Sequence, residues 1–357
     1  MTKDAADAAT EGVPEEKPPS RTKQIVTGVV TLLVVLLVFG IVFPQFGDYG
    51  QAWDAIQDMS NAALVALAIA TIVNILLYVL PYLAALPGLR YWPAFVVRQT
   101  SFMISNVVPA GGAFGLATQY GMLSSYGFAP APTTAAIGIT SVWNIFVTLA
   151  LPVLAIIGLL LTGYTNAEAA MIAVVGLVVI GVLIGLFAYI LKSDANARKL
   201  GELGDSIVAW FMGLFNKEIE TSFGDAVVDF RVSIVDVVGA RWPAITFTNL
   251  LQQLAQFSVL WLAVAGIQGS FTDPVTLAEA FAAFSFARLG TFIPITPGGL
   301  GTVDAILVAI LSAFGLDNSQ AMAADMVWRA LTYFPQVFIG VGTLLGWGRW
   351  NSRRTKT

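Results

Sequence analysis

Pro294-Ile295-Thr296-Pro297-Gly298-Gly299-Leu300-Gly301 interrupts a segment, residues 280–314, that is hydrophobic on both sides of the interruption. Proline removes a backbone hydrogen-bond donor and blocks the continuation of a helix, and glycine permits turns that other residues resist. The pattern therefore predicts a helix, a turn and a second helix that returns. Because the flanks are apolar, we expect a re-entrant hairpin whose turn lies at membrane depth, shielded by protein or facing water.

A second interruption of the same kind occurs at residues 108–115, within the hydrophobic segment 91–126. Both segments carry the same landmarks in the same order. These are Arg98, Gly111-Gly112, Tyr126-Gly127 and Trp143 in the first, and Arg288, Gly298-Gly299, Phe314-Gly315 and Trp328 in the second. Gly and Pro breaks are common in membrane helices, but two breaks with matching landmarks are less common. The pattern favours an internal repeat with two re-entrant hairpins.

Long apolar runs surround these two hairpins. A bilayer core about 30 Å thick needs roughly 20 apolar residues per crossing helix. Six runs reach or approach that length: residues 25–43, 62–85, 133–161, 169–191, 244–266 and 321–347. The chain is 57% hydrophobic and 11% charged, whereas soluble domains carry about 25% charged residues. We therefore expect an all-α polytopic membrane protein with about six full spans plus the two hairpins.

The positions of Lys and Arg predict the orientation, because these residues gather on the cytoplasmic side. Basic residues flank the first and last runs and recur between residues 192 and 241, whereas the connections 44–60, 162–168 and 267–275 contain none. We therefore place both termini in the cytoplasm. Helix 62–85 then runs inward and helix 244–266 runs outward, so the two repeats are predicted to be inverted.

The predicted organisation follows in chain order. It comprises a disordered cytosolic tail (1–23), a single transmembrane domain (24–347) and a basic cytosolic tail (348–357). Within the domain we expect a first repeat at about 61–162, an amphipathic cytosolic connection at 192–241 and a second repeat at about 243–347. Apolar residues in the connection recur at helical spacing, which predicts two amphipathic helices at the membrane surface or packed beneath the bundle.

Several chemistries are excluded by composition. The chain has no Cys and no His, which removes thiolate chemistry, disulfides and Cys/His metal sites. It also removes the most common general base near neutral pH. The sequence has no Gly-rich phosphate loop with Lys-Ser/Thr, so ATP is not expected to be the direct energy source. We expect no metal and no cofactor, and any proton-linked step must use carboxylates or water.

Five ionisable residues lie inside the apolar runs, where each costs several kcal/mol by insertion scales; they are Arg98, Arg288, Asp304, Asp325 and Arg329. One interpretation is structural: Asp304 or Asp325 pairs with Arg329 and locks helices together. The other is that the three arginines bind an anionic lipid headgroup, because a guanidinium holds phosphate by two parallel hydrogen bonds. The two aspartates would then pair with the arginines or carry a proton.

The paired glycines support a headgroup site. A helix that begins just after Gly111-Gly112 or Gly298-Gly299 points free amides and its positive dipole end at the turn, which favours an anion. The absence of side chains also lets a bulky headgroup approach the backbone. We therefore include Gly111, Gly112, Gly298 and Gly299 among the candidate binding residues.

Polar residues form stripes on three of the predicted spans. Interhelical hydrogen bonds, worth about 0.6 kcal/mol per contact, explain each stripe separately, and a path for a headgroup explains them together; both interpretations stay open. The candidate pathway residues are Asn74, Asn144, Asn249, Gln253 and Gln256.

Residues 292–304, Phe-Ile-Pro-Ile-Thr-Pro-Gly-Gly-Leu-Gly-Thr-Val-Asp, followed by Phe314-Gly315 and Trp328-Arg329, resemble the lysylphosphatidylglycerol synthase transmembrane-domain family. This is the flippase-like membrane region of the multiple peptide resistance factor. Residues 106–112 fit the first hairpin of that family, and the resemblance covers roughly residues 25–347. The acid of the motif is commonly Glu and is Asp304 here, which leaves its role open.

The resemblance implies lipid translocation in the cell membrane of a prokaryote. Ten residues follow Trp347, so we expect the soluble aminoacyltransferase domain of two-domain relatives to be absent and the protein not to be an enzyme. The cargo stays open among a phospholipid, an aminoacylated lipid, a glycolipid and a polyprenyl-linked lipid.

A flippase or scramblase for an anionic or aminoacylated phospholipid or a lipid-linked headgroup is the favoured function. One alternative is a polyprenyl-lipid-dependent glycosyltransferase, which would need the outward acids Asp48, Asp54 and Asp58, whose spacing fits no particular metal site. Another is a non-transporting regulator of lipid metabolism. Membrane lipids are the expected partners and nucleic acid is not, and a homo-oligomer and a separate lipid-modifying enzyme stay open.

Overall fold

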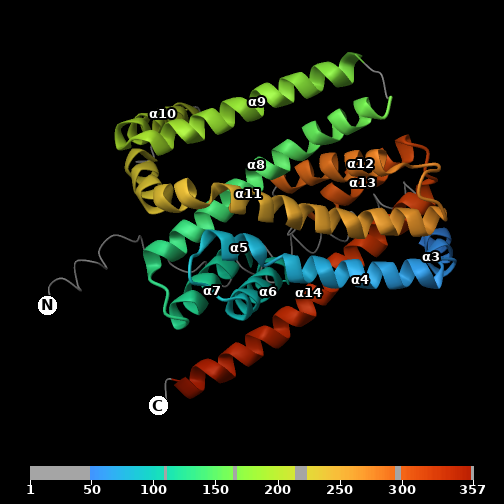
Figure 1. Ribbon diagram of the computed structural model, residues 1–357, viewed down its shortest axis with the longest axis horizontal. Helices are drawn as coiled ribbons and strands as arrows, with labels where there is room; N and C mark the ends of the chain where they lie inside the picture. The colour runs from blue at the N-terminus through green and yellow to red at the C-terminus, as the bar shows by residue number, and fades with distance from the viewer. Residues whose placement is uncertain (1–48, 108–110, 164–166, 214–222, 294–298, 355–357) are drawn as a thin grey trace, which may run out of the picture.

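The chain is all-helical throughout the part that its structure, a computed structural model, describes: residues 49–107, 111–163, 167–213, 223–293 and 299–354 (Figure 1). No β-strand occurs in these ranges. The helices, labelled as in Figure 1, are α3 (Tyr49–Gln57), α4 (Asn61–Leu77), α5 (Leu80–Ala85), α6 (Tyr91–Val107), α7 (Gly111–Ser125), α8 (Pro130–Leu161), α9 (Ala167–Lys192), α10 (Asp194–Gly213), α11 (Phe223–Gln268), α12 (Leu277–Leu289), the 3-10 helix η3 (Gly290–Phe292), α13 (Thr302–Ala313) and α14 (Asn318–Arg354). The predicted tail 1–23, the predicted span 25–43 and Gly298 lie outside the described residues.

Four helical segments in the described ranges are long and apolar enough to cross a bilayer, which confirms a multi-pass membrane protein. They are Asn61–Ala85, Pro130–Leu161, Gly224–Gln268 and Asn318–Arg353. Their outer faces carry large apolar side chains, as on α4, where Val65, Ile69 and Ile72 are 58–59% exposed. Soluble proteins rarely expose contiguous apolar surface of this kind, so these faces are suited to lipid. Helix α9 matches the predicted run 169–191.

The predicted separation between the second amphipathic helix and the span after it was wrong. A single 46-residue helix, α11, contains both, with Pro243 in its interior. Proline removes one hydrogen bond, but Ile234, Val238 and Ile245 lie on one face of α11 and are buried in the same apolar cluster. Packing on both sides of the proline therefore outweighs the local break. The first amphipathic helix corresponds to α10, which packs on α11.

Two helical hairpins occupy the positions predicted from the Pro/Gly breaks. In the first, α6 and α7 lie so close that a Cβ on Gly111 would fall 2.3 Å from the carbonyl oxygen of Ile104. In the second, α12 and η3 pack on α13, and the Thr302 hydroxyl donates to the Gly290 carbonyl at 3.3 Å. The four helices have 17, 15, 13 and 12 residues, fewer than the roughly 20 that a full crossing needs.

The two halves of the chain pack against each other reciprocally. Helices α4 and α11 contact each other and run in opposite directions (Figure 1). Helix α6 of the first hairpin packs on α14, and α12 of the second hairpin packs on α8. The two largest apolar clusters in the described ranges result from this packing, one around α11, α12 and α13 and the other around α5 and α8.

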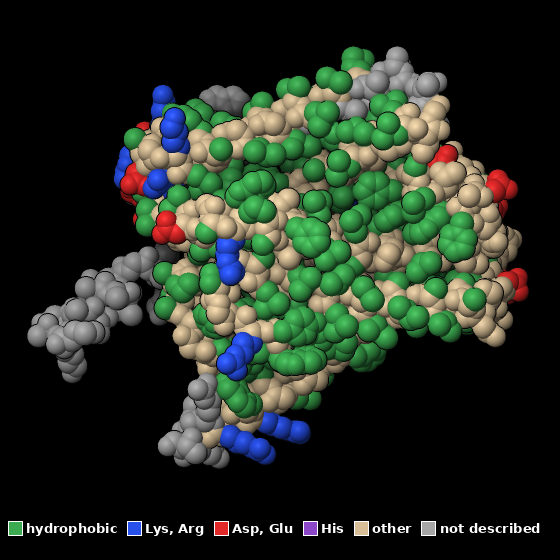
Figure 2. Space-filling model, viewed as in Figure 1, with side chains coloured by type: hydrophobic (Ala, Val, Ile, Leu, Met, Phe, Trp, Pro, Cys, Tyr) green, Lys and Arg blue, Asp and Glu red, His purple; other side chains and the backbone are tan. Residues whose placement is uncertain are grey.

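The ends of the molecule differ in charge. In Figure 2 the Lys and Arg side chains gather at the left, over α10, the start of α11 and the end of α14, and some Asp and Glu side chains lie beside them. The right end, at α3 and the connection between α11 and α12, shows Asp and Glu, and no Lys or Arg is visible there on this face. Asp54 on α3 and Asp58, directly after it, are exposed.

Candidate functional site

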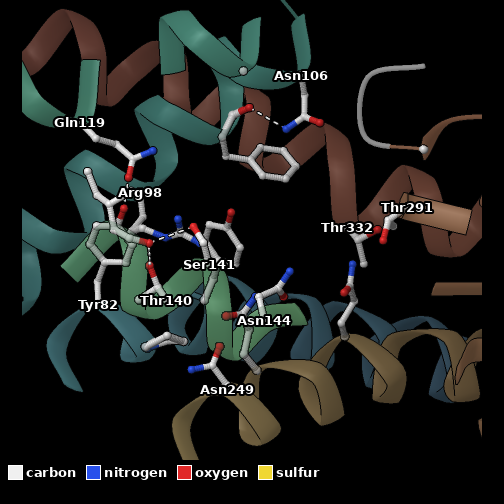
Figure 3. Close-up of a pocket in the computed structure, with 18 of the residues that line it drawn as sticks. Tyr82, Arg98, Asn106, Gln119, Thr140, Ser141, Asn144, Asn249, Thr291 and Thr332 are labelled. Atoms are coloured by element: carbon white, nitrogen blue, oxygen red, sulfur yellow. Dashed lines mark hydrogen bonds between the residues drawn. The ribbon is translucent and has the colours of Figure 1, made fainter. Parts of the chain in front are cut away.

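Both hairpins border one polar cavity of about 630 Å³ (Figure 3). The first hairpin contributes Asn106 and Gly112, which flank its turn, and the second contributes Thr291 and Gly299, which flank the other turn. The end of α4, α5 and the central parts of α8, α11 and α14 complete the wall. Residues beside two breaks that are almost 190 residues apart in sequence therefore face the same space.

The cavity lies deep along the spanning helices. Arg329 on its wall is eleven residues beyond Asn318, the first residue of α14, which is about 16 Å along the axis at 1.5 Å per residue. Gln256 is twelve residues before the end of α11 at Gln268, or about 18 Å. Both depths are close to half of the roughly 30 Å hydrocarbon thickness.

All three predicted arginines line this cavity, from three different helices: Arg98 on α6, Arg288 on α12 and Arg329 on α14. The side chains of these residues are partly buried. No Asp, Glu or Lys is among the lining residues in the described ranges. The wall therefore carries positive charge and no facing carboxylate.

Arg98 lies against aromatic rings and not against an acid. Its guanidinium carbon is 4.3 Å from the ring centre of Tyr78 and 4.6 Å from that of Tyr82, in range for cation–π attraction. The Tyr82 hydroxyl donates to Gln119, and Gln119 Nε2 donates to Ser101 Oγ at 2.7 Å. This hydrogen-bonded chain fixes Tyr82. Arg98 Nε is buried without a hydrogen-bond partner in the described part of the chain, where Arg98 also forms no ion pair.

Arg329 has a carboxylate partner, whereas Arg288 has none among the described residues. Arg288 Nε is buried and unpartnered within the described ranges, and no acid there pairs with this side chain. Arg329 forms an ion pair with Asp304, whose side chain is fully buried. Of the two pairings that the sequence left open, the structure shows Asp304–Arg329. Asp325 is also buried, and its Oδ1 has no partner among the described residues.

The predicted helix starts after the glycine pairs need correction. Helix α7 begins at Gly111 itself, and Gly112 lines the cavity. Helix α13 begins at Thr302, three residues after Gly299, because Gly299 and Gly301 have positive φ angles of 69° and 89° and form a turn. The Gly301 amide donates to the carboxylate of Asp304. One amide expected to face an anion is therefore already satisfied by the protein.

The predicted polar pathway is divided between the wall and the layer behind it. Asn144, Asn249 and Gln256 line the cavity. Gln253 lies behind the wall and donates from Nε2 to Asn144 Oδ1 at 3.3 Å. Asn74 is buried on α4 and is not part of the wall. The stripes are therefore divided between residues that line the cavity and residues that lie behind its wall.

Several wall residues were missed by the sequence analysis, among them Tyr82, Gln119, Thr140, Thr291 and Tyr333. Polar side chains in the short helices of the two hairpins were the available signal for Gln119 and Thr291. Tyr82 and Tyr333 gave no signal, because aromatic residues are ordinary in apolar runs.

Comparison with known proteins agrees with the motif. Residues 25–340 match the model of the family described as the lysylphosphatidylglycerol synthase TM region. The chain belongs to this family. It is 25% identical over 260 residues to a UPF0104 membrane protein of Methanothermobacter thermautotrophicus, covering 70% of this chain and 74% of that one. A UPF0104 membrane protein of Methanocaldococcus jannaschii is 41% identical over 54 residues, which are 15% of this chain and 23% of the relative. The resemblance stated from the residues is thus confirmed.

Proposed function

We propose that this member of the family is a lipid transporter of the flippase or scramblase type. The headgroup of a phospholipid or lipid-linked phosphate passes through the cavity while the acyl chains stay in the bilayer. One observation carries the proposal: Arg98 and Arg288, from the two different hairpins, line one mid-span cavity without an ion pair in the described part of the chain.

The energetic argument concerns these two charges. An arginine at the centre of a membrane helix costs about 2.5–3.5 kcal/mol by insertion scales. Two arginines without counterions therefore lower the stability of the folded protein in the membrane. A phosphate that enters the cavity offsets this cost, because guanidinium groups bind phosphate through charge-assisted and often bidentate hydrogen bonds. The tyrosine rings beside Arg98 position its guanidinium group, but neither Arg98 nor Arg288 has a carboxylate partner among the described residues, and a bound phosphate would supply the missing negative charge.

The arrangement of the two halves supports a mechanism in which the cavity opens alternately to the two sides of the membrane. The antiparallel α4 and α11 and the reciprocal packing of each hairpin on the other half are what two inverted repeats would produce. Inverted repeats with broken helices place a substrate site near the midplane, and rocking of one repeat against the other exposes it to each side in turn.

The charge asymmetry supports an orientation. The end rich in Lys and Arg would face the cytoplasm and the end at α3 the outside, in the cell membrane of a prokaryote. In this orientation the C-terminus is cytoplasmic. The chain would act without chemistry of its own on the lipid, as a transporter and not as an enzyme.

The test is translocation in reconstituted vesicles. Purified protein is placed in phosphatidylcholine vesicles with a trace of phosphatidylglycerol labelled on an acyl chain with a fluorophore that external dithionite bleaches. Empty vesicles should lose only outer-leaflet fluorescence, whereas protein-containing vesicles should also lose the inner-leaflet signal.

Matched variants connect this activity to the cavity. Arg98→Gln and Arg288→Gln should each slow translocation at least about tenfold, the factor that corresponds to losing one charge-assisted contact. Arg90→Gln, at an exposed arginine just before α6 that does not line the cavity, is the control and should leave the rate unchanged. Equal loss in all three variants, or no inner-leaflet bleaching with the unmodified protein, would contradict the proposal.

A further inference from the structure

The charge of the cavity wall indicates which lipid headgroups the site accepts. The described lining contains three arginines and no acidic residue. The two nearby carboxylates do not line the cavity: Asp304 is fully buried and bonded to Arg329, and Asp325, four residues before Arg329 on α14, is buried behind the wall.

The aromatic residues do not compensate for the missing carboxylates. Aromatic faces can bind a ligand ammonium through cation–π attraction. Here Arg98 already lies over the rings of Tyr78 and Tyr82, and Arg329 lies 4.9 Å from the ring centre of Trp328. The protein's own cations therefore occupy these faces, and a ligand ammonium would meet guanidinium groups instead.

From this geometry we infer that the site selects lipids whose headgroup carries a net negative charge and rejects those whose headgroup carries an added amino acid with ammonium groups. Phosphatidylglycerol fits the wall through its phosphate. Lysyl-phosphatidylglycerol has the same phosphate but adds two ammonium groups, which gives it one net positive charge. The inference rests on the proposed transport function and narrows its substrate class.

The neutral wall residues agree with a phosphate ester of a polyol. Asn106, Ser141, Asn144, Asn249 and Thr291 place amide and hydroxyl groups around the arginines. Such groups hydrogen-bond to hydroxyls of a glycerol or sugar without requiring a charge. Like charges brought together at a poorly solvated site repel each other strongly. The added ammonium groups should therefore weaken the binding of the aminoacylated lipid.

The test compares acyl-labelled phosphatidylglycerol with acyl-labelled lysyl-phosphatidylglycerol in the same reconstituted vesicles. We expect the aminoacylated lipid to move at least about tenfold more slowly, as one unfavourable charge contact predicts. Equal or faster movement of the aminoacylated lipid overturns the inference and leaves the transport function standing.

Variants test whether the arginines are the cause. In Arg98→Gln and Arg288→Gln the rates of the two lipids should converge, whereas Arg98→Lys should keep the preference because it keeps the charge. Arg90→Gln serves again as the control and should keep the full preference. A preference that persists in both Gln variants at once would contradict the role given to these side chains.

A binding measurement separates failure of the inference from failure of the proposed function. Thermal unfolding of the detergent-solubilised protein is followed with each lipid and with soluble glycerol 3-phosphate. If no lipid moves in vesicles, transport fails; the inference then stands only if phosphatidylglycerol stabilises the protein more than the aminoacylated lipid does. Equal stabilisation by glycerol 3-phosphate would mean that the ligand is a soluble phosphate and would overturn the inference.

Discussion

At the scale of single residues, the arginines of the site were predictable and their surroundings were not. Arg98, Arg288 and Arg329 stand out because an ionisable residue inside an apolar run is costly and rare. Their partners depend on contacts between helices. Tyr82 comes from α5 and Gln119 from α7, and only the folded chain places the Tyr82 ring against Arg98 on α6 and Gln119 against the Tyr82 hydroxyl. The choice of Asp304 over Asp325 as the ion-pair partner of Arg329 likewise depends on how α13 meets α14.

The Asp304–Arg329 pair gives a prediction about stability. Asp304→Asn should lower the free energy of unfolding by about 3–5 kcal/mol, because it leaves a mostly buried guanidinium without its counterion. Thermal unfolding in detergent measures the change. The double variant Asp304→Asn with Arg329→Gln removes both charges and should recover part of the loss. A single variant as stable as the unmodified protein, or a double variant less stable than the single one, would show that the pair is not structural.

At the scale of elements, the sequence predicted the long helices and the two hairpins well, because Pro/Gly breaks within apolar runs have a direct backbone cause. It failed where tertiary packing overrides local signals. Pro243 did not end α11, since apolar residues on both sides of it pack into one cluster. The start of α13 moved to Thr302 because two glycines with positive φ extend the turn. Neither effect has a signature in the local pattern.

The close contact in the first hairpin predicts different effects for two adjacent glycines. Gly111→Ala should destabilise the protein by about 1–3 kcal/mol, as overpacking does, because its Cβ would lie 2.3 Å from the carbonyl oxygen of Ile104. Gly112→Ala is the matched control, since nothing lies within 4 Å of its added Cβ. That variant should be neutral or gain about 0.5–1 kcal/mol, the helix preference for Ala over Gly. Thermal unfolding that ranks the two variants in the reverse order would contradict the hairpin geometry.

At the scale of the whole molecule, the reciprocal packing of the halves places residues of both hairpins beside one cavity. The Lys and Arg side chains visible in Figure 2 gather at one end, together with some Asp and Glu, and no Lys or Arg is visible on this face at the other end. The sequence landmarks predict two related halves, and this internal repeat stays a prediction. The sequence did not predict which helices of one half cover the hairpin of the other, because that depends on packing between distant segments. The cavity is a product of this arrangement and of no single motif.

The position of the Lys and Arg residues at one end of the molecule predicts the orientation of the protein in the membrane. The chain has no Cys, so single cysteines report without interference. Asp58→Cys, directly after α3, should react with a membrane-impermeant maleimide in intact cells. Lys199→Cys on α10 should react only after the cells are permeabilised. Both positions are exposed in the structure. The opposite labelling pattern would reverse the proposed orientation.

The most direct test of headgroup binding in the cavity is to map where a lipid headgroup contacts the protein within the bilayer. A phosphatidylglycerol that carries a photoreactive diazirine on its headgroup glycerol is incorporated with the protein into vesicles, irradiated, and the modified peptides are identified by mass spectrometry. If the headgroup passes through the cavity, adducts should form on cavity residues such as Asn144 and Thr291. The Arg98→Gln, Arg288→Gln double variant should give at least about tenfold fewer of these adducts. Adducts confined to the helix ends and the outer lipid-facing surface, with the same yield in that variant, would contradict headgroup binding in the cavity.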